Sequence, residues 1–246
     1  MIGSEAKEDI ARRMLDMHER SGSRESSLKA ADLILKNFGS KGGLAAPALS
    51  LKARLAGGQN SSKLEGILRQ LKSLDANDRA VVEALSELYF MKAEASAKGA
   101  FSREIYSLSS KNPLADLNAA YGKYDQIQAA YETTCVHAGA SWCGPAMYQL
   151  ARVSEQFTGS ITPLDIPRTL EPEMVKGFLA RKKSIIDTVD AKGLAADDRS
   201  LQEANGGSTN PEWTGSILWQ NASDWQSERV SGETGNGYIQ WHANAN

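Results

Sequence analysis

Side chains that could do chemistry are few and scattered in this 246-residue chain. Its three histidines, His18, His137 and His242, have no spacing that indicates a nucleophile and its base. The motifs G-x-S-x-G, H-E-x-x-H, G-x-G-x-x-G and the P-loop do not occur. Two carboxylates far apart in the sequence could still form a glycosidase pair in an all-α barrel. The sequence nevertheless favours a protein without enzymatic activity, and we expect no cofactor and no metal.

The two cysteines, Cys135 and Cys143, are the most informative reactive residues, because they end the short loop CVHAGASWC. Facing helix ends can bring two Cα atoms within the roughly 4.4–6.8 Å that a disulfide requires. We therefore predict a Cys135–Cys143 disulfide and an oxidising compartment, such as the periplasm or the extracellular space. Two alternatives stay open. With His137 the cysteines could belong to a zinc site, although a structural site takes four ligands, or both thiols could be free in a cytoplasmic protein.

The residues around this loop, 113–161, predict two helices that pack together. Ala120, Tyr124, Ile127 and Tyr131 recur at helical spacing in the first run. The second run has an equivalent stripe, formed by Ala146, Leu150, Val153, Phe157 and Ile161. Since the loop is too short to let the helices diverge, we expect an antiparallel helical hairpin.

The rest of residues 1–204 predicts further helices, over about 5–20, 25–38, 43–56, 61–74, 78–98 and 101–110. Helix pairs then begin near residues 5, 43, 76 and 113, a spacing close to the ~34-residue period of tetratricopeptide repeats. The consensus of that repeat is absent. We predict an all-α, TPR-like α-solenoid of antiparallel helix pairs, with an irregular all-α bundle as the alternative. Residues 171–204 are expected to form a C-terminal capping helix, either continuous or broken near Gly193.

Residues 205–246 form a Gly/Trp-rich C-terminal extension with a different composition. It holds Trp213, Trp219, Trp225 and Trp241, four of the five tryptophans. SILWQ and YIQWH have short β character. A segment of this kind cannot build its own core, so its aromatic rings are expected either to pack on the helices or to face a ligand.

Overall charge argues against a nucleic-acid partner, and hydropathy argues against a membrane-spanning segment. The net charge of −2 and the absence of a basic stripe argue against nucleic acid. No apolar run approaches the roughly 20 residues of a transmembrane helix. The first residues, MIGSEAKED, lack the basic start and apolar core of a secretory signal, so the compartment is inferred from the cysteines.

The stretch CGPAMYQLARVSEQF, followed by PLDIPRTLEPEMVKGFL, resembles the C-terminal part of tetratricopeptide-like periplasmic proteins of gliding and predatory deltaproteobacteria. The likeness covers about residues 113–200. The corresponding positions are Cys143, Ala146, Leu150, Phe157, Pro163, Pro167 and Leu170. The resemblance implies a non-enzymatic adaptor of an envelope-spanning gliding-motility assembly, located in the periplasm near the outer membrane.

Two functional hypotheses follow. The first is a protein-protein interaction scaffold that binds a protein or peptide of the cell envelope on its concave helical face. The residues expected to contact that partner are Tyr89, Tyr121, Tyr124, Tyr131 and Tyr148. The alternative is a glycan or cell-wall binder that uses Trp213, Trp219, Trp225 and Trp241, because an exposed indole offers an apolar face to a sugar ring.

Overall fold

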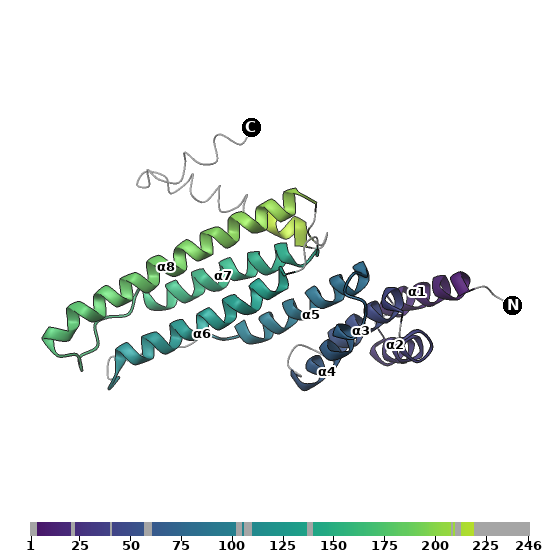
Figure 1. Cartoon of the computed structure of the whole chain (residues 1–246). Helices are drawn as coiled ribbons and strands as arrows, with labels where there is room; N and C mark the ends of the chain where they lie inside the picture. The colour runs from purple at the N-terminus through teal and green to yellow at the C-terminus, as the bar shows by residue number, and fades with distance from the viewer. Residues whose placement is uncertain are drawn as a thin grey trace.

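The computed structural model describes residues 4–20, 23–39, 41–56, 61–101, 105, 110–136, 140–207, 209 and 213–218. Regular structure in these residues is helical, without a strand, which confirms the all-α fold class (Figure 1). The long helices are α1 (Ser4–Arg20), α2 (Arg24–Phe38), α3 (Gly42–Ala56), α4 (Ser61–Lys72), α5 (Arg79–Ala97), α6 (Pro113–Thr134), α7 (Cys143–Ile161) and α8 (Pro172–Asn205). A short helical segment follows at residues 213–218.

The helices form an elongated arrangement in which α5 links two groups (Figure 1). Helices α1–α4 gather at the N-terminal end, and α6, α7 and α8 run side by side at the other. The first half of α5 packs into a core with α3 and α4, through residues such as Leu85 and Leu88. Its second half, including Phe90 and Ala93, belongs to the core of α6, α7 and α8. Helix α5 is therefore shared between two cores.

Local sequence signals explain where several of these helices begin. The side chain of Asp78 accepts a hydrogen bond from the backbone N–H of Ala80 at 2.9 Å, and Asn112 accepts one from Ala115 at 3.2 Å. These N-caps satisfy amide groups that have no partner within the helix. Pro113 and Pro172 occupy the first turns of α6 and α8, where a missing N–H costs little.

Helix α7 lies at the centre of the C-terminal group, and its predicted apolar stripe is confirmed. All five stripe residues are buried. Helix α8 runs unbroken past Gly193, so the alternative of a break at this glycine is wrong. A Cβ atom at Gly193 would lie 2.8 Å from the Cβ of Ser154. This glycine therefore lets α8 approach α7 closely.

Two expected elements are not present as predicted. Among residues 101–110, the described positions 101, 105 and 110 are not helical, so the structure does not support the second helix of the third pair. The ring of Phe101 instead packs edge-on against Phe157 of α7, with centroids 4.8 Å apart. In SILWQ, residues 216–218 are helical rather than extended, and Ile217 is fully buried. YIQWH lies outside the described residues.

The close approach of α7 and α8 predicts opposite effects for two glycines of one helix. Gly193→Ala should reduce the free energy of unfolding by about 1–3 kcal/mol, because the new methyl group overpacks against Ser154. Gly177→Ala is the matched control, since Gly177 is exposed and a Cβ there meets nothing within 4 Å. It should be neutral or stabilise by up to about 1 kcal/mol. Urea unfolding followed by circular dichroism measures both, and equal effects would contradict the packing role.

Candidate functional site

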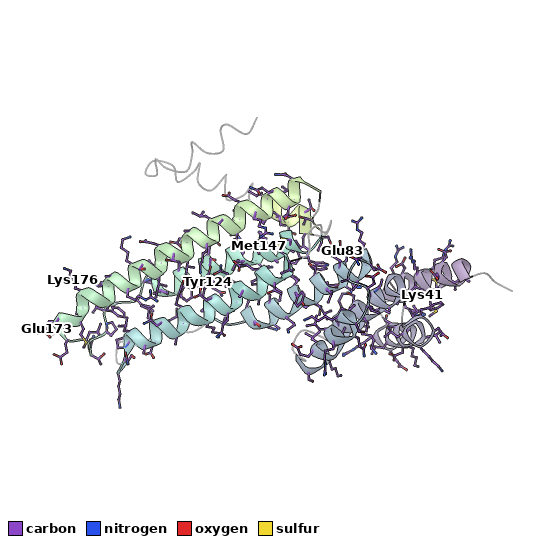
Figure 2. All side chains as sticks on the ribbon, in the orientation of Figure 1. Lys41, Glu83, Tyr124, Met147, Glu173 and Lys176 are labelled. Carbon is purple, nitrogen blue, oxygen red and sulfur yellow. A yellow bond between two sulfur atoms is a disulfide. The ribbon has the colours of Figure 1, made fainter. Side chains whose placement is uncertain are left out.

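The five tyrosines expected to form a partner surface lie in different surroundings. Tyr124 and Tyr131 are 0% and 1% exposed, so both are core residues and offer no surface to a partner (Figure 2 shows Tyr124 among α6–α8). Their rings lie on the apolar stripe of α6, and that stripe faces the neighbouring helices rather than solvent. The other three are half-buried. The predicted surface is therefore not assembled.

Each half-buried tyrosine has its own neighbours. Tyr89 lies beside the Lys72 ammonium of α4, 5.7 Å from its ring centroid. Tyr148 faces Trp213, with centroids 6.3 Å apart. Tyr121 points toward α8, where Lys192 lies 5.5 Å from its ring centroid. The three half-buried tyrosines therefore contact three different parts of the molecule.

Lys192 links α8 to α6 by polar contacts. Its Nζ donates hydrogen bonds to Asp125 at 2.9 Å and to the Tyr121 hydroxyl at 3.4 Å. Burial alone would lower the pKa of Lys192, but these hydrogen bonds and the Asp125 charge raise it above its ordinary value. Tyr121 is thus part of a contact that joins two helices.

A groove lies between the second half of α5 and the middle of α7. Its volume is about 1580 Å³. Its lining includes the apolar residues Phe90, Met91, Ala95 and Val153 and both positive and negative side chains. Ala56, Leu64 and Tyr131 extend the lining to α3, α4 and α6. Of the five predicted tyrosines, the groove includes Tyr131, whose side chain is almost wholly covered.

The charged residues of the groove are arranged in pairs, with one exception. Lys92 pairs with Glu65 of α4, and Arg152 pairs with Glu155 at 2.9 Å. The Tyr131 hydroxyl donates a hydrogen bond to Glu94 at 2.5 Å. The hydrogen bond from Lys92, with its charge, lowers the pKa of Glu65. Lys98 at the end of α5 is exposed and, within the part of the chain that the structure describes, forms no ion pair.

Aromatic rings from distant parts of the sequence pack around Phe90, which is one of the lining residues of the groove. The Phe90 ring lies 5.1 Å from Trp142 and 5.5 Å from Trp213, measured between centroids. Aromatic pairs at such distances add about 0.5–1.5 kcal/mol each to their apolar burial. Trp213 therefore packs on the helices. This is one of the two arrangements expected for the aromatic rings of residues 205–246. Trp219, Trp225 and Trp241 lie outside the described residues.

The predicted disulfide is present beside this aromatic cluster. The sulfur atoms of Cys135 and Cys143 are 2.09 Å apart, and the Cα atoms 4.7 Å. Both sulfurs are consumed by this bond, so the zinc-ligand and free-thiol alternatives do not hold. The loop is also attached to α5, because the N–H and hydroxyl of Ser141 donate to Glu83 at 3.0 and 2.7 Å (Figure 2 labels Glu83). His137 lies outside the described residues.

Sequence reasoning missed the groove because its walls come from three regions far apart in the chain. Phe90 lies within the helix predicted over about 78–98, where its position alone does not mark it as a groove residue. Arg152 looks like an ordinary polar position of an amphipathic helix. The signal that could have found the site is negative: FSREIYSLSS contains four serines and an isolated Arg–Glu pair, which makes it a weaker helix than its neighbours.

Comparisons with known proteins give no relative for this chain. No protein-family model matches it, no curated protein matches it, and no solved structure matches it. Within the described residues, no helix is both long and apolar enough to span a membrane, and no cluster of three metal-ligating side chains is found.

The buried Tyr131 predicts a specific loss of stability at alkaline pH. Burial, and secondarily the hydrogen bond to Glu94, raise the pKa of Tyr131 far above its ordinary value near 10. The unfolded chain therefore loses this proton first, so the stabilisation is complete below about pH 10 and is lost as the pH rises further. Tyr131→Phe should remove about 1.4 kcal/mol of the loss between pH 8 and pH 11. Urea unfolding at both pH values measures the difference, and an unchanged pH dependence would contradict it.

The disulfide predicts a moderate stabilisation. It closes a sequence separation of 8 residues, and the chain-entropy model gives about 2–3 kcal/mol for so short a loop. The double variant Cys135→Ser/Cys143→Ser should lose that amount in urea unfolding. Wild-type protein with dithiothreitol should show the same loss. A loss in the serine variant alone would mean that the serines, rather than the missing bond, cause it.

Proposed function

We propose that this chain is a non-enzymatic adaptor that binds a segment of a partner protein in the groove between α5 and α7. The observation that carries the proposal is the groove itself. Its lining combines the apolar side chains of Phe90, Met91 and Val153 with charged side chains, of which Lys92 and Arg152 are paired. Protein interfaces have this composition, with aromatic and methionine side chains at the centre and a polar rim.

The dimensions of the groove fit a short peptide segment. Residues 90–97, the part of α5 that lines the groove, extend over about 10 Å at 1.5 Å per helical residue. That length accommodates about two helical turns or about three extended residues. Ala95, Ser96 and Ala97 are small, so a peptide backbone can approach α5 closely. A TPR-like array would present a partner-binding face of this kind.

We further propose a periplasmic location in a bacterial cell envelope. The Cys135–Cys143 disulfide supports an oxidising compartment. The resemblance of residues 113–200 to periplasmic tetratricopeptide-like proteins supports the same location and brings gliding motility into the proposal. The glycan-binding alternative has less support, because Trp213 packs against Phe90 and Tyr148 instead of lining an open surface.

Blocking the groove should abolish partner capture. Ala95→Arg places a long charged side chain at an exposed groove position, and Ala195→Arg does the same on α8, outside the groove lining. In affinity capture from envelope extracts of the native host, Ala95→Arg should recover about tenfold less partner than wild type, which corresponds to about 1.4 kcal/mol. Ala195→Arg should behave as wild type.

The comparison between the two variants is what tests the proposal, since capture alone would not locate the contact. Equal recovery by wild type and both variants would place the partner elsewhere on the molecule. Loss with both variants, together with an unchanged free energy of unfolding, would also contradict the groove as the binding site.

A further inference from the structure

The described part of the chain ends next to the groove. The Trp213 ring packs edge-on against Phe90, a groove residue, and against Tyr148, whose ring lies under the Arg152 guanidinium at 5.2 Å. Thr209 is 6% exposed and lies against Gly144, where an added Cβ would be 2.3 Å from its hydroxyl oxygen. Thr209 thus lies against the first turn of α7, and Trp213 lies against Tyr148 of the same helix. Leu218, a few positions after Trp213, is the last described residue, and the chain continues from there.

Residues 219–246 have the chemistry that the groove would accept. Their apolar side chains are mostly large and aromatic, namely Trp219, Trp225, Val230, Tyr238, Ile239 and Trp241. Their charged residues are mainly acidic, namely Asp224, Glu228 and Glu233 against Arg229. The groove has the opposite balance, with Lys92, Lys98 and Arg152 against Glu94 and Glu155. Charge and apolar content are therefore complementary.

We propose that residues 219–246 dock in the groove of their own chain and compete with the partner. The reach is ample, because an extended chain spans about 3.3–3.6 Å per residue and the α5 wall of the groove is about 10 Å long. A tethered segment binds at a high effective concentration, so even weak intrinsic affinity keeps the groove occupied until a partner displaces it. This proposal rests on the proposed use of the groove as a peptide-binding site and adds its regulation.

Photocrosslinking in the purified full-length chain tests this docking. Ser96→p-benzoylphenylalanine places the crosslinker at an exposed position in the groove. Lys176→p-benzoylphenylalanine is the control, at the end of α8 farthest from α5 (Figure 2). Irradiation at low protein concentration, followed by peptide mass spectrometry, should give crosslinks from position 96 to residues 219–246, at least about tenfold above those from position 176. This excess corresponds to a preference of about 1.4 kcal/mol.

Charge reversal gives a second measurement. Adding Lys98→Glu to the Ser96 variant should lower the crosslink yield about threefold, because an exposed ion pair contributes about 0.2–1 kcal/mol. Crosslinks from position 96 that reach only the helices, or that reach residues 219–246 only in covalent dimers, would overturn the proposal. Because the purified sample contains no partner, failure of the crosslinking test does not affect the conclusion from the Ala95→Arg capture experiment. Suppose instead that position 96 crosslinks to residues 219–246 but Ala95→Arg captures as much partner as wild type. That result would overturn only the proposal that a partner binds in the groove.

Discussion

Burial of α7 between α6 and α8 is the constraint on which the C-terminal group of helices depends. One residue, Ser154, shows how closely the three helices are fitted. Its hydroxyl interacts with the Tyr124 hydroxyl of α6 at 2.8 Å and donates to the Leu150 carbonyl oxygen at 2.8 Å. On its other side, Ser154 lies against Gly193 of α8. A buried polar group that is satisfied in this way fixes the register of neighbouring helices, because any shift would leave hydroxyl groups without partners.

The same fit continues at the two ends of α7. At its start, the disulfide joins α7 to α6, and the adjacent Ser141 is held by Glu83 of α5. At its end, the Lys182 ammonium of α8 donates to the Thr162 and Leu164 carbonyl oxygens, at 3.2 and 2.6 Å. A cation at this position is favourable because it meets the negative end of the helix dipole, although burial lowers the pKa of Lys182. Three helices, α5, α6 and α8, are thereby attached to α7, which forms one wall of the groove.

Helix positions were largely predictable from the sequence, whereas the site was not. Stripes such as Leu150, Val153 and Phe157 identify helices because period 3.6 is a local property of the chain. The Phe101 ring, by contrast, packs on Phe157, more than fifty positions away, and a local period does not reveal such a contact. Tyr124 and Tyr131 show a related limit. An aromatic residue on an apolar stripe looks the same in the sequence whether it faces a core or a ligand, and only the packing of α6 decides between them.

The division of α5 between two cores has a consequence for dissecting the molecule. Leu85 and Leu88 belong to the core with α3 and α4, and Phe90 and Ala93 to the core with α6 and α7. A fragment that ends within or beside α5 exposes the apolar residues that served the missing half, and such surfaces promote aggregation. In an array of independent repeats, each unit contacts only its neighbours and terminal units can be removed one by one. Here α5 contributes residues to both cores, so loss of either core destabilises the other. The two ends of the molecule are therefore expected to unfold in one cooperative step.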